Sequence, residues 1–459
     1  MNQISKILKA QNDFFETNVT LNIKYRKNSL ISLKKVVLDA EGKIIEALHR
    51  DLRKPKFEAY TAEIATVISE LDYFIRNIEK LAKPRRVKSS LLNFPSTDYI
   101  YSDPYGKVLV VASWNYPFQL ILSPLIAAIA AGNCVVCKPS EISKHTSNLI
   151  AKLIAKVFNP EHVSVIEGGK ETSDILLKQN WDYIFFTGST SVGKIFMKAA
   201  AQQLCPITLE LGGKSPVIVN KDAQIEVAAK RIVWGKLFNA GQTCIAPDYL
   251  YVHKDIAEKL TNQLKIEFDN ALGKNKQNSE FYARIVNHSH FHRIVKLFEK
   301  EKVIYGGKSV EKDKYIEPTL LNDIDWNSPI MKEEIFGPIL PILTFDKLDE
   351  TISLINKKEK PLAAYYFGQN AKDQNIFLKK LYFGGGCIND TILQVSNSNL
   401  PFGGVGASGM GAYHGEKSFR CFSHEKAILK RGTWMDFPFR FAPYRELKWI
   451  KYLFKLIRL

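Results

Sequence analysis

The chain runs from Val108 to Cys137, thirty residues, without a single charged side chain. An apolar stretch of that length is long enough to span a bilayer as a helix. Polar residues, glycine and proline interrupt it, however, at Asn115, Pro117, Gln119, Pro124, Gly132 and Asn133. The segments VLVVAS and CVVC are typical of short buried strands, with SPLIAAIAAG as a helix between them. Strands that are apolar on both faces predict a parallel sheet covered by helices rather than a membrane span.

The alternation of strand and helix extends over most of the chain. Between residues 107 and 210, helical patterns separate the segments VLVVAS, CVVCKP, VSVIEG, YIFFTG and PITLEL. A second alternation begins after about residue 212, with PVIVN, YLYVH and LPILTF as its strands. Two amphipathic helices, expected at 31–53 and 57–82, precede both. We therefore expect an α/β protein with two doubly wound domains.

The chain carries 64 basic and 47 acidic residues, a net charge of +17, and basic proteins often bind nucleic acid or anionic membranes. Its lysines are scattered, and no helix-turn-helix, zinc-finger or RNA-binding pattern is present, so we expect no nucleic-acid partner. Six cysteines in 459 residues are too sparse for a disulfide scaffold. The first residues lack the apolar core of a secretory signal, and we expect free thiols and a cytoplasmic setting.

Cys244 lies in the segment NAGQTCIAPDY, where small and polar residues surround the thiol in a predicted loop. The thiolate is the reactive form of cysteine, and a polar cradle of this kind lowers the pKa of the thiol. The pattern favours an accessible nucleophile, and a buried, inert thiol is the alternative.

Two other polar side chains follow predicted strands. Glu210 ends the strand of ITLELGGKSP, where a carboxylate can act as a general base over a cleft. Asn115 follows the strand of ASWNYPF, where its amide can donate to an oxyanion. An edge carboxylate and a turn asparagine before Pro117 are the structural alternatives.

Three further motifs are compatible with nucleotide binding. In YIFFTGSTSVG a strand runs into glycine and small hydroxyl residues ahead of a helix, whose free N–H groups can hold a phosphate. The lysine and glutamate of CKPSE and the second glutamate of KEEIFGP can bind ribose hydroxyls. Each motif alone is equally compatible with an ordinary strand-to-helix turn or with surface charge.

These motifs, in this order, resemble the aldehyde dehydrogenase superfamily. LELGGKSP and GQTCIAPDY are highly specific for it, and the segment LPFGGVGASGMGAYHGEKSFRCFSH resembles its class 3 branch of dimeric enzymes for fatty or aromatic aldehydes. The resemblance covers nearly the whole chain. It implies two doubly wound Rossmann-like domains with a small β oligomerisation arm, a homodimer, and NAD(P)-dependent oxidation of an aldehyde to the carboxylic acid.

The resemblance also implies how the chain is divided. We expect an NAD(P)-binding domain, a catalytic domain that carries the nucleophile, an oligomerisation arm and a basic amphipathic C-terminal helix. These are expected at residues 1–83 with 106–210, at 211–390, at 84–105 with 391–440, and at 441–459, respectively.

Carried over to this sequence, the family's nucleophile is Cys244, which attacks the aldehyde and passes through a thiohemiacetal to a thioester. Asn115 and the N–H group of Cys244 form the oxyanion hole, and Glu210 activates the water that hydrolyses the thioester. The family's cofactor contacts correspond to Trp114, Lys138, Glu141, Gly188, Ser189, Gly193, Glu334 and Phe336.

The choice of cofactor and substrate follows from the same resemblance. Glu141 beside a ribose 2′-hydroxyl would repel a 2′-phosphate, so NAD is expected, although class 3 relatives often accept NADP. Trp234, Phe238 and Ile392 correspond to the substrate funnel. Their size and apolarity favour a medium- or long-chain aliphatic or an aromatic aldehyde, and ordinary core packing is the alternative.

Two clusters contain metal-binding residue types. Cys134 and Cys137 have CxxC spacing, but residues three apart in a strand face opposite sides, so we expect buried thiols. His288, His290 and His292 would share one face only in a strand, and the flanking pattern is helical. We therefore expect no metal site.

The C-terminal segment RELKWIKYLFKLIRL places its basic residues on one stripe of a helix and large apolar residues over the remainder. A helix of this kind over 445–459 can lie at a membrane interface, and it is too short and too charged to span a bilayer. Docking on the same chain or on a partner subunit is the alternative.

Two alternatives remain to an enzyme that oxidises an aldehyde to a thioester and then hydrolyses it. A CoA-acylating relative resolves the thioester with CoA and does not need a base, so the presence of Glu210 argues against it. A basic binding protein without enzymatic activity is the other, and the completeness of the motifs argues against that class.

Overall fold

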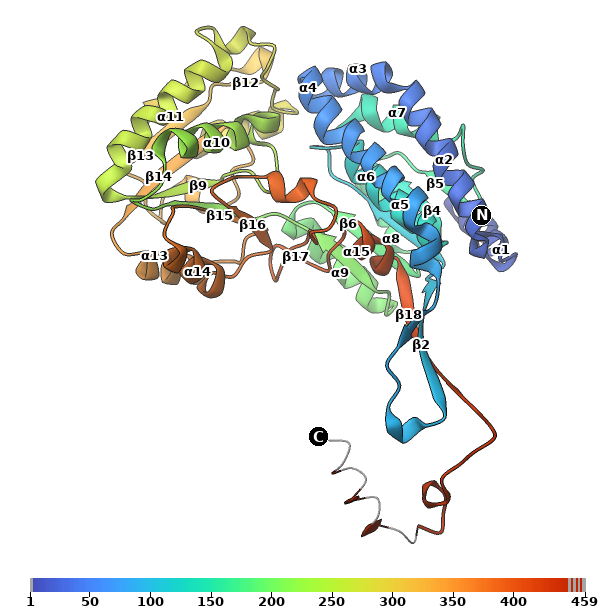
Figure 1. Cartoon of the computed structure of the whole chain (residues 1–459). Helices are drawn as coiled ribbons and strands as arrows, with labels where there is room; N and C mark the ends of the chain where they lie inside the picture. The colour runs from blue at the N-terminus through green and yellow to red at the C-terminus, as the bar shows by residue number, and fades with distance from the viewer. Residues whose placement is uncertain (1–2, 445–446, 449–450, 453–454, 456–459) are drawn as a thin grey trace.

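The computed structural model describes residues 3–444, 447–448, 451–452 and 455. Two α/β domains lie side by side, and an antiparallel arm projects from the first of them (Figure 1). Each domain is built on one predominantly parallel sheet. The apolar strands predicted from the sequence form these sheets, which is the doubly wound α/β class expected.

The first domain contains a six-stranded sheet whose central strand, β3 (Lys107–Val111), begins the uncharged run. Five of its strands are parallel, and the short edge strand β17 pairs antiparallel with β7. In spatial order the strands are β17 (Gly409–Met410), β7 (Ile207–Glu210), β6 (Tyr183–Thr187), β3, β4 (Cys134–Lys138) and β5 (Val163–Val165).

Helices cover both faces of this sheet because its strand residues alternate between two hydrophobic clusters. Val108 and Val110 pack against α2, α5 and α6, whereas Leu109 and Val111 pack against α1, α8 and α9. The helices of this domain are α1 (Gln3–Glu16), α2 (Ile23–Asp39), α3 (Glu41–Leu52), α4 (Lys56–Glu58), α5 (Ala65–Ala82), α6 (Gln119–Ala131), α7 (Lys144–Ile154), α8 (Lys170–Leu177), α9 (Thr190–Gln202) and α15 (Glu416–Cys421).

The N-terminal helices differ from the two that the sequence predicts. The Asn22 side chain accepts hydrogen bonds from the N–H groups of Lys24 and Tyr25, so α2 begins well before residue 31. The expected helix 31–53 breaks at Ala40, where the backbone leaves helical geometry. The second expected helix begins as α4 and a π-helical turn over Ala59–Ile64 before it continues as α5.

The second domain contains a seven-stranded sheet with the same construction. Val217 and Val219 of β8 pack against α10 and α11, and Ile218 packs on the opposite face with α12, α13 and α14. Its strands in spatial order are β10 (Lys302–Tyr305), β13 (Thr319–Asn322), β14 (Ile339–Phe345), β9 (Tyr249–His253), β8 (Pro216–Val219), β15 (Ala363–Phe367) and β16 (Gly385–Ile388). Its helices are α10 (Ile225–Leu237), α11 (Ala257–Leu272), α12 (His288–Phe298), α13 (Leu348–Asn356) and α14 (Ala371–Lys380).

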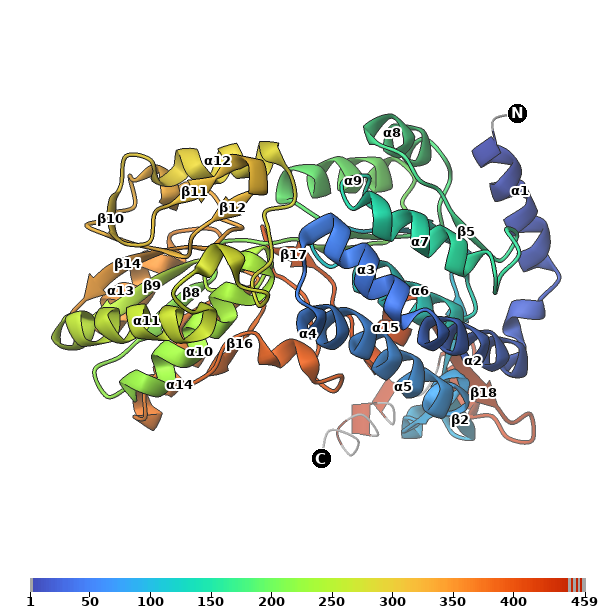
Figure 2. The same ribbon diagram turned by 90° about the horizontal axis from the view of Figure 1, so that it is seen from above.

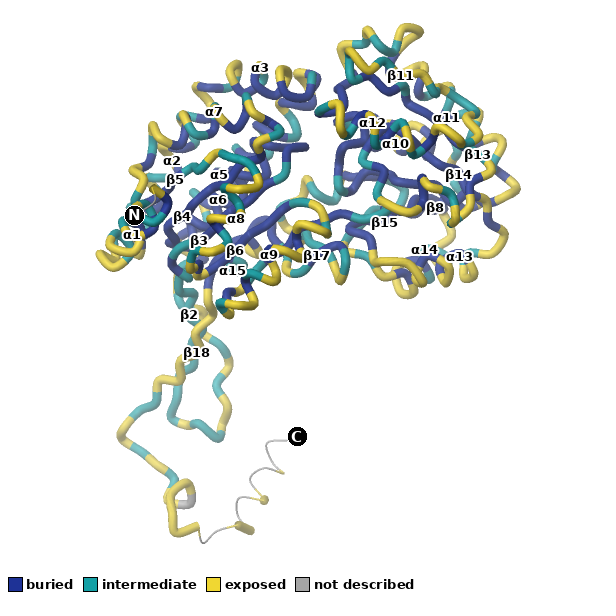
Figure 3. The backbone as a smooth tube through the Cα atoms, turned by 180° about the vertical axis from the view of Figure 1, so that it is seen from behind, coloured by how far each residue is buried: buried dark blue, intermediate teal, exposed yellow. Residues whose placement is uncertain are grey.

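The arm is a three-stranded antiparallel sheet of β1 (Arg85–Val87), β2 (Ser96–Pro104) and β18 (Ser423–Arg431). Apart from the buried Ser423 at the start of β18, its residues are intermediate or exposed, in contrast to the buried sheets of the two domains (Figure 3). Residues 391–440, expected as one arm segment, divide between structures. β17 joins the first sheet, α15 packs against α6, and only the later part forms β18.

Most of the segment expected as the C-terminal amphipathic helix lies outside the described residues. Leu447, Lys448, Lys451, Tyr452 and Lys455 are described, and all five are helical and exposed. Within the described parts of the chain, no helix combines the length and the apolar character needed to cross a membrane.

Candidate active site

A cavity of about 850 Å³ lies between the two domains. The loops after β3, β6 and β7 form one wall, and the segment after α10 forms another, so the cavity lies beyond the carboxyl ends of parallel strands, where α/β folds bind ligands. Of the residues singled out in the sequence, Trp114, Asn115, Gly188, Ser189, Trp234, Phe238, Cys244, Glu334, Phe336 and Ile392 line it. Lys138, Glu141, Gly193 and Glu210 are not part of its lining.

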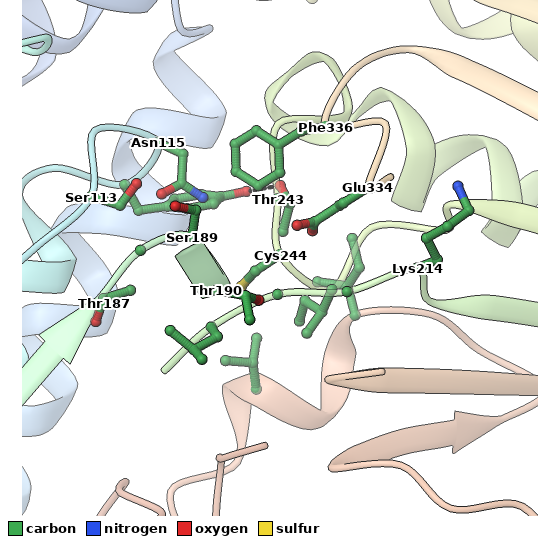
Figure 4. Close-up of a pocket in the computed structure, with 18 of the residues that line it drawn as sticks. Ser113, Asn115, Thr187, Ser189, Thr190, Lys214, Thr243, Cys244, Glu334 and Phe336 are labelled. Carbon is green, nitrogen blue, oxygen red and sulfur yellow. Dashed lines mark hydrogen bonds between the residues drawn. The ribbon is translucent and has the colours of Figure 1, made fainter. Parts of the chain in front are cut away.

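Cys244 is partly exposed and lies at the centre of this cavity, with Thr190, Thr243 and Glu334 around it (Figure 4). Asn239 and Ala240, both with φ of 53°, turn the chain sharply after α10 and bring the cysteine loop into the cavity. Burial and the nearby Glu334 and Glu210 carboxylates raise the pKa of the thiol well above its usual range. The lowered pKa expected from a polar cradle is therefore absent in this state, because desolvation outweighs the backbone N–H groups that favour the thiolate.

Asn115 is buried beside the cysteine loop, and its side-chain Nδ2 donates to the carbonyl of Gln242 over 3.1 Å. Its own backbone carbonyl accepts from Lys54 Nζ at 3.0 Å and from Asn239 Nδ2 at 2.9 Å. A primary amide has two N–H groups, so one bond to Gln242 leaves a second donor. Three contacts with distant parts of the chain thus fix the position of this amide.

Lys54 is held by an ion pair with Glu63, and both side chains are fully buried. Glu63 Oε2 also accepts from the N–H groups of Phe118 and Gln119 at the start of α6. A buried ion pair is costly to desolvate unless hydrogen bonds satisfy its remaining atoms, and here they do. The pair therefore acts as a fixed support beneath the Asn115 loop.

Glu210 ends β7 and is buried, but its side chain lies behind the cavity wall rather than in it. Among the described residues neither carboxylate oxygen has a hydrogen-bond partner, and burial raises the pKa of this carboxyl well above its usual range. The negative charge of Glu210 nevertheless contributes to the raised pKa of the Cys244 thiol. A buried carboxyl with a raised pKa is a stronger base than an exposed one once it is ionised.

Glu334 and Phe336 lie on a loop that faces Cys244 (Figure 4). Burial and Asp248 raise the pKa of Glu334 to about 8. Gly212 leaves room for the Glu334 carboxylate, which a side chain at that position would displace. Phe336 has φ of 50°, uncommon for a bulky residue, and its ring meets Trp114 edge-on at 5.3 Å.

Three charged residues hold this loop in place. Lys214 pairs with Asp248 and donates to the carbonyls of Ile330 and Glu333, each at 2.9 Å. Asp248 Oδ1 accepts from the N–H group of Ile335 at 2.9 Å. From α12, Arg293 donates to the carbonyls of Glu334 and Ile335.

The N-terminus of α9 forms a further part of the cavity. Ser189 caps the helix by accepting from the N–H group of Val192, and Thr190 anchors it by donating to the carbonyl of Ala407. Gly188 and Gly193 are needed for packing, since a side chain at either would collide with Phe186 or Leu211, respectively. Free N–H groups at such an end are suited to binding a phosphate.

Lys138 and Glu141 lie at the end of β4, apart from the cavity lining. Lys138 Nζ binds Glu141 Oε2 at 2.7 Å, with the lysine buried and the glutamate half exposed. In this structure the two side chains predicted to contact ribose bind each other.

The opposite end of the cavity is apolar. The rings of Trp234 and Phe238 are 5.4 Å apart, and Ile392, with φ of 62°, faces the same space. Positive φ in a β-branched residue is strained and is kept only where the surroundings enforce it. Other apolar residues in the cavity lining are Phe57, Leu120, Leu393, Val395 and Phe402.

Two pairs of charged residues that support the site are not predicted from the sequence. Lys214 and Asp248 stand inside the motifs LELGGKSP and GQTCIAPDY, so those motifs contained a signal for them. Lys54 and Glu63 belong to no motif, and only the fold brings them to Asn115.

Comparisons with known proteins agree with this geometry. The profile of the aldehyde dehydrogenase family matches residues 1–428. The 4,4'-diaponeurosporen-aldehyde dehydrogenase of Staphylococcus aureus is 45% identical over 99% of this chain and 100% of its own length. The dimeric NADP-preferring aldehyde dehydrogenase of Mus musculus is 43% identical over 94% of this chain and 95% of its own. The substrate-bound structure of Staphylococcus aureus AldH superposes with a TM-score of 0.97 at 45% identity, covering 99% of this chain and 100% of that one. The chain therefore belongs to the aldehyde dehydrogenase family, the NAD(P)-dependent oxidoreductases that oxidise aldehydes.

Proposed function

We propose that Cys244 is the nucleophile of this aldehyde oxidation, Asn115 the oxyanion donor and Glu210 the general base. The observation that carries the proposal is the meeting of the Cys244 thiol and the Asn115 amide in one cavity, with the Glu210 carboxyl close enough to affect the thiol. The aldehyde, once in the cavity, lies between the apolar end and the α9 end.

The reaction begins when Cys244, which is partly exposed in the cavity, gives its proton to solvent and its sulfur attacks the carbonyl carbon. Negative charge then develops on the carbonyl oxygen, where the second N–H of the Asn115 amide and the N–H of Cys244 stabilise it. A bound nicotinamide cofactor would supply the two-electron oxidant, because removal of hydride from the thiohemiacetal carbon leaves a thioester on the Cys244 sulfur. Glu210, once its side chain turns into the cavity, removes a proton from water, the water oxygen attacks the thioester carbon, and the C–S bond breaks. The carboxylic acid leaves and the Cys244 thiolate is restored.

Several features of the cavity suit a dinucleotide. The α9 N-terminus with Ser189 can hold phosphate, and Glu334 with Phe336 and Trp114 can hold the nicotinamide end near the thiol. Lys138 and Glu141 keep further donors and acceptors beside their mutual ion pair, and these can bind ribose hydroxyls. A carboxylate at Glu141 favours NAD over NADP, whose 2′-phosphate it would repel.

The substrate is a medium- or long-chain aliphatic or an aromatic aldehyde. Trp234, Phe238 and Ile392 support this, because they present an apolar wall toward the cysteine. An apolar pocket gains about 0.8 kcal/mol for each methylene that it buries.

The protein acts as a homodimer assembled through the arm. The arm projects from the first domain and exposes large apolar residues, and a relative is named dimeric. A small sheet of this kind gains stability when a further surface covers it. The exposed apolar residues on the arm are Leu91, Phe94, Ile428, Leu429 and Trp434.

Residues 445–459 add a peripheral membrane contact through their basic stripe and apolar residues. Deletion of 445–459 should release the protein from anionic vesicles in a flotation assay and leave turnover of soluble aldehydes unchanged. Equal flotation of the full and shortened chains would contradict this contact.

One assay tests the central proposal. NADH formation from hexanal, decanal and benzaldehyde should be abolished in Cys244→Ala and retained in Cys205→Ala, whose thiol is buried outside the cavity. Turnover that survives in Cys244→Ala would refute the nucleophile assignment. Addition of CoA should not change the product from the acid to an acyl-CoA.

A further inference from the structure

The exposed face of α12 carries two histidines, His288 and His292, four residues apart. Side chains at that spacing on a helix are neighbours on one face. The sequence predicts that no two of the three histidines share a helix face. This is correct for His290 but wrong for His288 and His292, which lie on the same face. His290 turns inward and its ring lies 4.9 Å from the ring of Trp114 in the cavity.

A carboxylate from another element joins the two histidines. Glu311 lies on the short helical turn η7 (Glu311–Asp313), between β11 (Ser309–Val310) and β12 (Tyr315–Ile316), a hairpin that lies beside α12 (Figure 2). Its Oε1 is 2.8 Å from His292 Nε2 and 3.9 Å from His288 Nδ1. One ligand atom from each of the three side chains lies within 4.8 Å of the other two.

The backbone on both sides of this cluster is fixed. The N–H group of Lys314 donates to the carbonyl of Glu311 at 2.9 Å, and Asp313 pairs with Arg284 at 2.8 Å. On the helix side, the Asn287 side chain caps α12 by accepting from the N–H group of His290 at 2.9 Å. The three ligands therefore extend from rigid supports, as binding sites require.

We propose that His288, His292 and Glu311 form a surface site for a divalent transition metal ion such as Zn²⁺. Two imidazole nitrogens and one carboxylate oxygen suit Zn²⁺, Ni²⁺, Cu²⁺ or Co²⁺, and are a poor set for Mg²⁺ or Ca²⁺, which prefer oxygen ligands. Bonds of about 2.0–2.2 Å require only small rotations of these exposed side chains, and water completes the coordination.

The bound ion would connect α12 to the β11–β12 hairpin. The same helix uses Arg293 to hold the carbonyls of Glu334 and Ile335, and His290 to contact Trp114. An ion on the outer face thus fixes a helix whose inner face supports one wall of the cavity. The site itself depends only on the three ligands and not on the proposed catalytic roles.

The test is a Zn²⁺ titration of the full, untagged, chelator-treated chain, followed by competition with a chromogenic zinc indicator. Zinc also binds reactive thiols, so the Cys244→Ser variant serves as the background. In that background we expect one ion per chain with an affinity that falls at least tenfold in His292→Ala or Glu311→Gln. His49→Ala, which removes another exposed histidine, should bind as the background does.

Thermal unfolding supplies a second measurement. Zn²⁺ should raise the Tm of the Cys244→Ser chain and of its His49→Ala form, because a ligand that binds only the folded state stabilises it. It should not raise the Tm of the His292→Ala form. Equal zinc affinity in the His292→Ala, Glu311→Gln and His49→Ala forms would overturn the proposal and leave ordinary surface ion pairs.

Discussion

The hydroxyl of Tyr116 lies 2.6 Å from Thr243 Oγ1, and this hydrogen bond joins the residue after Asn115 to the residue before Cys244. The two residues belong to different domains and stand 127 positions apart. Lys54 Nζ lies 4.2 Å from the centre of the Tyr116 ring, so the ring is held from its face as well. This buried contact between domains therefore adds to the bonds that join Asn115 to Gln242 and Asn239 in setting the spacing between the oxyanion donor and the nucleophile.

Tyr116→Phe keeps the ring and removes this contact. We expect kcat to fall about tenfold, since a misplacement of about 1 Å can cost up to 10²-fold in rate, while the affinity for NAD⁺ stays unchanged. Steady-state kinetics with decanal would separate the two quantities. Tyr382→Phe, at an exposed ring outside the cavity, is the control. An equal loss in both variants would contradict a positioning role for Tyr116.

Glu210→Gln should stop the reaction after the thioester forms. The amide fills the same space but cannot take a proton from water, so steady-state turnover should fall by about 10²–10³ while a first burst of NADH remains. Intact-mass spectrometry should then find the acyl group on Cys244. Glu299→Gln, an exposed carboxylate outside the cavity, should turn over normally. Normal turnover in Glu210→Gln would remove this residue as the base.

The pH dependence follows from the raised pKa values of Cys244 and Glu210. Both groups act in their ionised forms, and a raised pKa means that the ionised fraction grows as pH increases. Acylation needs the Cys244 thiolate and hydrolysis of the thioester needs the Glu210 carboxylate, so the rates of both steps should rise as pH increases above neutral. Because the Glu210 charge contributes to the raised pKa of the thiol, single-turnover acylation in Glu210→Gln should rise at a lower pH. A profile that is flat above neutral pH would contradict the assignment.

The sequence predicts features that depend on local hydrophobic pattern and local motifs, but it does not predict contacts between distant elements. Runs such as VLVVAS and PVIVN are buried on both faces, so hydrophobic pattern alone predicts the two parallel sheets. Cys244 and Asn115 lie in local motifs, and the structure places both in the lining of one cavity. Lys54 pairs with Glu63, and Tyr116 pairs with Thr243, across different elements of the fold. The hydrophobic periodicity of the sequence does not predict such contacts. Nor could it show that Glu311 lies opposite His292, because a hairpin sets that contact.

Lys54→Met tests the buried support beneath Asn115. The change leaves the Glu63 charge buried without its partner, which typically costs about 3–5 kcal/mol of unfolding free energy. We expect this loss in urea denaturation followed by circular dichroism, together with reduced kcat. Lys27→Met breaks the exposed pair of Lys27 with Glu79 and should leave stability nearly unchanged. Similar midpoints for the two variants would show that the buried pair contributes no more than a surface one.

The arm is tested by Leu429→Lys, which places a charge among the exposed apolar residues of β18. If a second copy covers this surface, burying an unpaired ammonium there is costly, and the dissociation constant of the dimer should rise at least tenfold. Sedimentation velocity over a concentration series measures this constant directly. Leu378→Lys makes the same change at an exposed position on α14, away from the arm, and should leave association unchanged. Leu429 is exposed in the single chain, so the dissociated Leu429→Lys monomer should keep its fold by circular dichroism. A variant that stays dimeric at every concentration would show that the subunits associate through another surface.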